Sequence, residues 1–320
     1  MQSLELSTRW PVDHAAAGVV VPDRSGPEPS PIDRSRFVVG DGGYPFRLAS
    51  LTKPLVAWAT LVAVEEGSVA LDDPVGQPGC TLEHLLSHAG GYPLEGAQPS
   101  EEPGRSRIYS NTGFELIGRH LVDATDMPLD EYLRLGVLEP LGMHHTRLEG
   151  SPAHGATSTV HDLLSFLAEL LDPTLITPTT AADAIRPHHP GLSGIVPGVG
   201  RFTPCPWALG FELAGDKHPH WTGRERSPRA FGHFGGAGTM MWVDPDARCG
   251  LVALTDRPFD QWAAEALRRW AELSDAVLTE VGQVSQVGQV SQVGQVGQVA
   301  RIAADRGAAP SDAPTRSPAG

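Results

Sequence analysis

A serine and a lysine three residues apart, Ser50 and Lys53, form the pair in this sequence whose types and spacing could do chemistry. A helix is expected to begin there, because the run 54–67 is mostly helix-forming, starts with Pro54 and ends with Gly67. Residues at i and i+3 share a helix face, so a neutral Lys53 could take the proton of Ser50 while backbone N–H groups favour an oxyanion. Burial can supply that neutral amine near neutral pH.

The Ser-x-x-Lys spacing alone is weak evidence, since an isolated match is more often a capping serine and a solvated lysine. Two further motifs follow it in order. Tyr109 and Asn111 lie in a loop that enters an apolar helical run. The third motif consists of His233, Phe234, Gly235 and Gly236.

This ordered triple resembles the class C β-lactamase and penicillin-recognising serine hydrolase superfamily, which includes family VIII-type esterases and D-alanyl-D-alanine carboxypeptidases. The likeness extends to segments 71–75, 81–88, 140–143 and 157–163, and it covers about residues 16–280. The resemblance implies an α+β fold of the β-lactamase/transpeptidase type. Such a fold has an antiparallel sheet flanked by helices and a mainly helical lobe.

The resemblance also implies a domain organisation. A hydrolase domain is expected at 1–280, with a sheet lobe from about 10–49 and 195–280 and a helical lobe at about 50–194. The apolar segments 16–21 and 36–39 indicate two N-terminal strands, and 239–243 with 250–255 indicates a hairpin. In the family these strands share one sheet, so the two ends of the domain would build one lobe.

Three segments complete this organisation. The stretch 187–206 is rich in Pro and Gly and is predicted to be a loop or lid. Apolar residues at helical spacing in 260–280 predict a terminal helix packed on the sheet. The period-three Val-Gly-Gln and Val-Ser-Gln repeat that opens the tail 281–320 matches neither helix nor strand, which predicts a low-complexity, disordered tail.

By the resemblance, the reaction is acyl transfer in which Ser50 is the nucleophile and Lys53 and Tyr109 share the general-base role. Whether Tyr109 is a phenolate or a neutral relay stays open. Backbone N–H groups of Ser50 and Gly236 would hold the oxyanion, and no cofactor is needed. Asn111 would orient Lys53 or a substrate amide. The predicted substrate-binding residues are Asn111, His233, Phe234, Gly235 and Gly236, with His233 lending positive or hydrogen-bonding character.

One departure bears on the substrate. Penicillin-recognising members usually carry a small hydroxyl residue at the position of Phe234, where it helps to bind a carboxylate. An aromatic ring favours apolar acyl or alcohol groups if it points into the site, which strand alternation leaves open. We therefore expect a carboxylic-ester hydrolase acting on a small ester or amide. The alternatives are a β-lactamase or D-alanyl-D-alanine carboxypeptidase, and a catalytically silent binding scaffold.

Composition limits the other function classes. A formal net charge of -14 without a clustered basic face argues against a nucleic-acid partner. Three widely spaced cysteines suggest neither a disulfide framework nor a zinc site. No apolar stretch is long enough to cross a bilayer, and the first residues lack the pattern of an export signal, so the expected location is the cytoplasm. The oligomeric state is not predicted.

Two alternative chemistries find no support. His84 and His88 stand four apart but lack a His-Glu-x-x-His pattern, so no metal site is expected. No Gly-x-Ser-x-Gly motif is present, which argues against the nucleophile elbow of an α/β-hydrolase.

Overall fold

The computed structural model describes residues 1–22 and 34–283 of the 320-residue chain. The chain divides into two compact units, Met1–Glu280 and Val281–Gly320. The predicted tail falls on the second unit and, from residue 284 onward, lies outside the described residues. The elements that position the predicted site all belong to the first unit.

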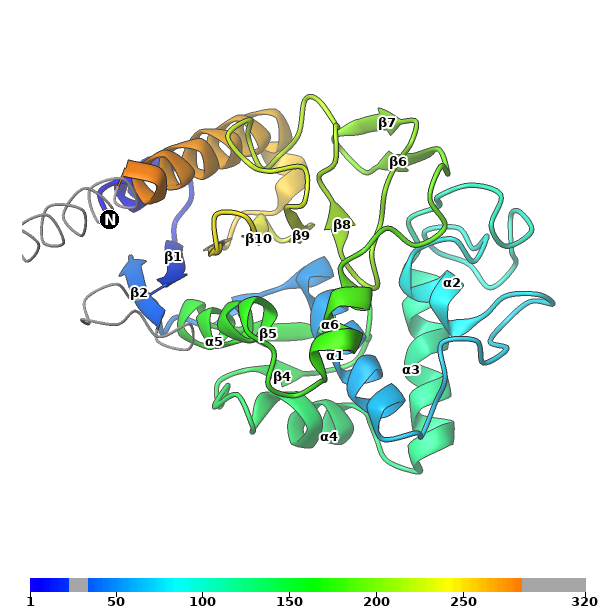
Figure 1. Ribbon diagram of the computed structural model, residues 1–320. Helices are drawn as coiled ribbons and strands as arrows, with labels where there is room; N and C mark the ends of the chain where they lie inside the picture. Colours follow the sequence, from blue (N-terminus) through cyan, green and yellow to red (C-terminus); the bar gives the residue numbers. More distant parts are fainter. Residues whose placement is uncertain (23–33, 284–320) are drawn as a thin grey trace, which may run out of the picture. The chain divides into compact units, whose positions relative to one another are not determined.

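A six-stranded antiparallel sheet joins the two ends of the first unit (Figure 1). Its strands lie in the order β2 (Arg34–Val39), β1 (Ala15–Pro22), β11 (Cys249–Thr255), β10 (Thr239–Asp244), β9 (Phe231–Gly235) and β8 (Glu212–Leu213). The register of β1 on β11 places Ala15 opposite Thr255. The prediction that the N-terminal strands share a sheet with the C-terminal hairpin is confirmed.

Helices cover both faces of this sheet, so β10 and β11 are buried along their whole length. On one face, α5 (Val160–Leu171) packs so closely that a Cβ atom at Gly18 would lie 2.7 Å from Val160. On the other face, a helix at 263–283 contacts Trp242, whose indole N–H donates to Ser274 Oγ at 2.9 Å. Because α5 lies within the range predicted for the helical lobe, that lobe contributes directly to the sheet's core.

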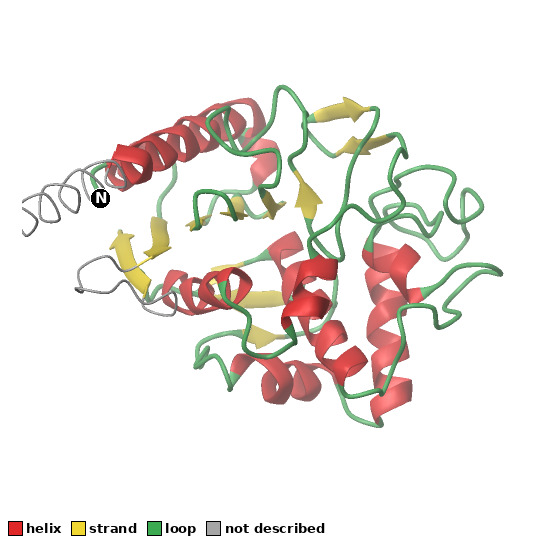
Figure 2. Cartoon of the chain, viewed as in Figure 1, coloured by secondary structure: helices red, strands yellow, loops and turns green. Residues whose placement is uncertain are grey.

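The remaining helices pack beside the sheet (Figure 2). They are α1 (Thr52–Glu65), α2 (Leu82–Leu86), α3 (Asn111–Thr125), α4 (Leu129–Leu133) and α6 (Pro178–Ala184), with 3-10 turns at Ser3–Arg9, Ala49–Leu51 and Phe259–Gln261 and a π turn at Arg134–Leu138. Nearly all of α1 is buried, which matches its lack of a polar face. It ends before Gly67, whose φ is +74°, as the sequence predicts.

Short strands lie outside the main sheet. One small sheet contains β3 (Phe46–Arg47), β5 (Ala156–Ser158) and β4 (Arg147–Leu148) in that order. The predicted loop at 187–206 contains the hairpin of β6 (Gly194–Val196) and β7 (Gly200–Phe202). The sequence does not predict these strands, because two or three residues are too few to show a period.

The apolar residues that predict a terminal helix packed on the sheet are buried in the structure. They are Trp262, Ala266, Trp270, Leu273 and Val277. Among the described residues, no helix combines the length and the apolar composition that a bilayer crossing requires.

Candidate active site

The turn that carries Ser50 is fixed from two sides. Ala49, immediately before it, has a φ of +47°, a left-handed conformation that is uncommon outside glycine. The Leu48 carbonyl accepts a hydrogen bond from Thr239 Oγ1 of β10 at 2.9 Å. The Leu48 N–H donates to the carbonyl of Ala156 in β5 at 2.9 Å. Contacts from two sheets therefore hold the strained backbone that leads into Ser50 and α1.

Lys53 is fully buried, and its Nζ atom makes three polar contacts. Nζ lies 2.7 Å from Asn111 Oδ1, 2.9 Å from the Ala153 carbonyl oxygen and 3.2 Å from Ser50 Oγ. The first two atoms can only accept hydrogen bonds. A neutral amine has two N–H groups and one lone pair. If Asn111 and Ala153 accept the two N–H groups, the lone pair faces Ser50, which is the arrangement needed to remove its proton.

The amide of Asn111, the first residue of α3, joins Lys53 to an acidic side chain. Its Nδ2 donates to Glu95 Oε1 at 2.6 Å, which fixes the amide with Oδ1 toward Lys53. The α3 start is itself capped by Ser110, whose Oγ accepts the Gly113 N–H at 2.9 Å. Of the two predicted roles for Asn111, the geometry favours orienting Lys53.

The electrostatics of Lys53 suit a general base. Burial lowers its pKa to about 7, and the carboxylates of Glu95 and Glu115 partly oppose this shift. About half of the molecules therefore carry a neutral amine near pH 7. Without the two glutamates the pKa would fall further.

Tyr109 lies against Lys53, with Nζ 4.7 Å from the centre of its ring. Its hydroxyl is buried and has no hydrogen-bond partner in the described part of the chain. Burial raises the pKa of Tyr109. Ser50 lies near enough to oppose that shift in part, although the two hydroxyl groups do not form a hydrogen bond of ordinary geometry. Tyr109 is therefore a neutral hydroxyl at neutral pH, which favours the relay over the phenolate.

His233 projects from β9 toward the same centre, and its ring lies 5.7 Å from that of Tyr109. Its Nδ1 lies 2.7 Å from the Phe234 carbonyl oxygen, so Nδ1 carries the proton and Nε2 is an acceptor. Burial, together with the charge of Lys53, lowers the pKa of His233 to about 3. The side chain is thus neutral, and only the hydrogen-bonding part of its predicted role remains.

The two glycines after Phe234 bring β9 against the Ser50 turn. A Cβ atom at Gly235 would lie 2.2 Å from the Leu48 carbonyl oxygen and 3.3 Å from Ser50 N, so only glycine fits there. Gly236 follows at the exposed end of the strand, and a Cβ atom there would meet nothing within 4 Å. The close approach of Gly235 to Ser50 N brings the end of β9 to the Ser50 turn, and the pairing of the Ser50 and Gly236 N–H groups as an oxyanion site stays a prediction.

The side chain of Phe234 lies on the other face of β9. His233 is opposite Met241, whereas Phe234 is opposite Met240, and neighbouring residues of a strand face opposite sides. The Phe234 ring packs 5.6 Å from Trp221, 5.3 Å from Phe259 and 5.7 Å from Trp270, measured between ring centres. It therefore belongs to an aromatic cluster under the terminal helix, and it offers no polar group to a substrate.

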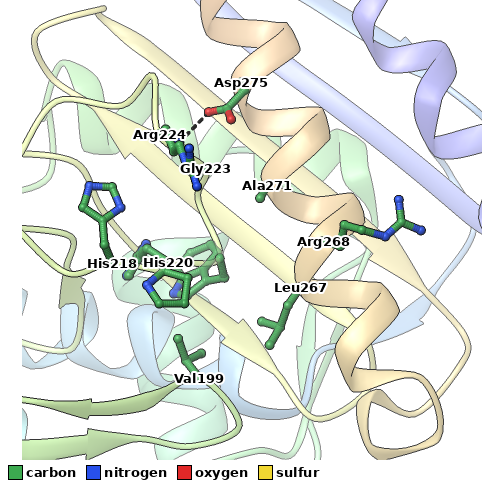
Figure 3. Close-up of a pocket in the computed structure, with 11 residues that line it drawn as sticks. Val199, His218, His220, Gly223, Arg224, Leu267, Arg268, Ala271 and Asp275 are labelled. Atoms are coloured by element: carbon green, nitrogen blue, oxygen red, sulfur yellow. Dashed lines mark hydrogen bonds between the residues drawn. The ribbon is translucent and has the colours of Figure 1, made fainter.

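Two cavities lie on the part of the chain around β9 and the Ser50 turn. One, of about 420 Å³, touches both Ala49 and Gly236 and is therefore next to the predicted oxyanion position. The other, of about 270 Å³, lies between the terminal helix and the loop around Trp221, and Figure 3 shows Arg224 and Asp275 at its edge. Neither cavity is lined by Ser50, Lys53 or Tyr109.

The structure adds residues that the sequence analysis misses. The Ala153 carbonyl is a backbone atom and leaves no signal in the sequence. Glu95 and Glu115 are acidic residues among many, and no spacing marks them. The sequence marks His88 only as a possible metal ligand, but its ring lies 4.5 Å from that of Tyr109.

The histidine pair considered for a metal does not converge on one. The His84 ring stacks on His189 at 4.2 Å, whereas His88 faces Tyr109. Across residues 1–22 and 34–283, no group of three or more His, Cys, Asp or Glu side chains is arranged to hold a metal ion.

The known proteins that this chain resembles include a beta-lactamase, an esterase and a penicillin-binding protein. A crystal structure of a beta-lactamase from Mycobacterium bovis is 45% identical, covers 87% of this chain and 99% of its own, and superposes with a TM-score of 0.81. Esterase EstB of Burkholderia gladioli is 36% identical over 113 residues, which cover 30% of this chain and 26% of the esterase. Penicillin-binding protein 4* of Bacillus subtilis is 28% identical over 171 residues, which cover 40% of this chain and 38% of that protein.

The match to these two curated relatives spans well under half of their length. The family assignment rests on broader coverage. The family model described as Beta-lactamase matches residues 41–275, a range that contains every predicted site residue and most of the chain. The chain belongs to the beta-lactamase family.

Proposed function

We propose that the protein is a serine hydrolase that acts through an acyl-enzyme and prefers carboxylic esters. The observation that carries this proposal is the buried Lys53, with a pKa of about 7 and its Nζ atom 3.2 Å from Ser50 Oγ. A structural lysine gains nothing from losing its charge in this way. A general base for a serine needs both that pKa and that distance.

In the proposed reaction, Ser50 Oγ attacks the ester carbonyl carbon while its proton passes to Lys53. The oxyanion lies between the N–H groups of Ser50 and Gly236. When the tetrahedral intermediate collapses, the bond to the alcohol breaks and the alcohol takes a proton from Lys53 through the Tyr109 hydroxyl. Water then attacks the acyl-enzyme and gives a proton to Lys53. When the bond between the acyl carbon and Ser50 Oγ breaks, Lys53 returns that proton to Oγ and the acid leaves.

The preference for esters rests on Phe234. A β-lactam or a D-alanyl-D-alanine peptide carries a carboxylate, which the small hydroxyl residue at this position helps to bind in penicillin-recognising relatives. Phe234 has no donor, and its ring is packed against Trp221, Phe259 and Trp270. Loss of one charge-assisted hydrogen bond costs about 1.5–3 kcal/mol, which is one to two decades in rate.

A β-lactamase or D-alanyl-D-alanine carboxypeptidase is the competing proposal. Its support is the 45% identity to a chain described as a beta-lactamase. An amide-type substrate of this kind would use the same Ser50 and Lys53, so the two proposals differ in specificity and not in mechanism.

The test compares catalytic efficiencies for p-nitrophenyl acetate and a chromogenic cephalosporin. We expect the wild type to favour the ester. Phe234→Thr should improve the cephalosporin relative to the ester if the smaller side chain leaves the aromatic cluster and its hydroxyl turns toward the site. Phe234→Val is the matched control, because valine has the shape of threonine without its hydroxyl. A wild type that favours the cephalosporin would establish the competing proposal. A folded protein that turns over neither substrate and resists a fluorophosphonate probe would instead support the silent scaffold.

A further inference from the structure

His88 is a buried histidine that the proposed reaction does not use. It lies just beyond α2 with a φ of +56°, a left-handed backbone conformation that costs energy for a residue with a side chain. Such strain persists only where the surrounding contacts hold it. At His88, these contacts are made with Tyr109 and with the residues on either side of it.

Two hydrogen bonds tie His88 to the backbone N–H groups of the residues before and after Tyr109. The His88 carbonyl accepts the Ile108 N–H at 3.0 Å, and the His88 Nδ1 atom accepts the Ser110 N–H at 3.2 Å. The centre of the imidazole ring lies 4.5 Å from the centre of the Tyr109 ring. One residue therefore holds the backbone before Tyr109, the backbone after it and the face of its ring.

The Ser110 N–H also fixes the tautomer of His88. Because Nδ1 accepts a hydrogen bond, a neutral ring carries its proton on Nε2. Burial, together with the nearby charges of Lys53 and Arg107, lowers the pKa of His88 well below its usual value, so the ring stays neutral. Its Nε2 is buried and has no partner among the described residues.

Four such unpartnered atoms gather at Tyr109. They are His88 Nε2, Tyr109 Oη, His233 Nε2 and Trp207 Nε1. Their rings adjoin one another, with centres 4.5–6.0 Å apart. Buried polar atoms without partners are rare in proteins, so a cluster of four calls for an explanation beyond packing. His88 Nε2 is a donor and His233 Nε2 an acceptor, so two neutral imidazoles of opposite tautomer lie against the Tyr109 ring.

We propose that His88 is a positioning residue that clamps Tyr109 in the site through its carbonyl and its Nδ1 atom. The role in turnover rests on the proposed hydrolase function, whereas the clamp itself does not. His88 acts through Tyr109, and it touches neither Ser50 nor the substrate in this scheme.

The test uses a matched pair of amides. In His88→Asn the amide oxygen occupies the place of Nδ1, and asparagine tolerates a positive φ. In His88→Gln the amide lies one methylene further out, where Nε2 was, and cannot reach the Ser110 N–H in the same way. His88→Phe keeps the ring but has no acceptor, which separates the clamp from packing.

We expect His88→Gln and His88→Phe to lower kcat for p-nitrophenyl acetate about 10- to 100-fold with little change in KM, the scale for a misplaced catalytic group. His88→Asn should stay within about threefold of the wild type, which is less than 1 kcal/mol. In a Tyr109→Phe background, none of the three should cause a further loss, because a residue that acts through Tyr109 has nothing left to position. An equal loss in both backgrounds would overturn the proposal.

Hydrogen exchange of the segment 105–112 tests the clamp without any reaction. Exchange should be faster than the wild type in His88→Gln and unchanged in His88→Asn. If His88→Phe fails to fold, the comparison of His88→Gln with His88→Asn still tests the clamp. A wild type without esterase activity would contradict the proposed function alone, whereas unchanged exchange in His88→Gln would overturn the clamp.

Discussion

The acid limb of the pH profile is the sharpest test of Lys53 as the base. Only the neutral amine can remove the Ser50 proton, and its folded pKa is about 7. At pH 8 roughly nine-tenths of the lysine is neutral, and at pH 5 about 1% is. We therefore expect kcat/KM for p-nitrophenyl acetate to rise about 90-fold from pH 5 to pH 8, with a midpoint near 7 and a slope of one.

A charge-removing substitution should move that midpoint in a known direction. The Glu95 carboxylate raises the pKa of Lys53, and it accepts a hydrogen bond from Asn111 Nδ2. Glu95→Gln keeps an acceptor for Asn111 but removes the charge, so the midpoint should shift to lower pH. Glu102→Gln is the control, since this exposed residue of the same loop does not contribute to the Lys53 shift.

The assay follows p-nitrophenol at its isosbestic wavelength between pH 5 and 9, with the spontaneous rate subtracted. A flat profile across this range, or a midpoint above 9, would refute the assignment of a buried neutral lysine as base. A Glu95→Gln midpoint that moves upward would refute the electrostatic reasoning even if Lys53 remains essential.

Two further outcomes follow from the site geometry. A fluorophosphonate probe should label Ser50, Ser50→Ala should abolish labelling without unfolding, and Tyr109→Phe should lower turnover by about two orders of magnitude or more, the scale for losing a proton relay; labelling at another serine would contradict the nucleophile assignment. Gly235→Ala should lower both the melting temperature and turnover, because its Cβ would lie 2.2 Å from the Leu48 carbonyl oxygen, whereas Gly236→Ala should leave the melting temperature unchanged; equal melting temperatures for the two variants would show that the backbone has room to shift.

The sequence predicted the parts of this site that depend on local spacing. Ser50 and Lys53 share one helix start, and Tyr109 and Asn111 share another, so short-range rules place each pair. The family resemblance then supplied their order and the position of Gly236. Tertiary packing brings the Ser50–Lys53 pair and the Tyr109–Asn111 pair together, and rules of local spacing do not predict it.

The parts that escaped prediction are those with no local pattern. The Ala153 carbonyl becomes a ligand of Lys53 only because the chain returns to α1 about 100 residues later in the sequence. Strands such as β3 and β4 have two residues each, too few for alternation to appear. The side of β9 that Phe234 faces does follow a local pattern. Once the His233 side chain is placed toward Tyr109, strand alternation puts the Phe234 side chain on the opposite side.

The low pKa of Lys53 has a consequence for the whole fold. Its unfolded pKa of about 10.5 lies above its folded pKa of about 7, so the unfolded chain binds the proton more tightly. This group therefore opposes folding at all pH values below 10.5, most strongly below 7, and the opposition fades as the pH rises between the two values. The acceptors at Asn111 and Ala153 offset part of that cost for either protonation state. A buried lysine that weakens its own fold and faces a serine is hard to explain as structure, and it is what an acyl-transfer site requires.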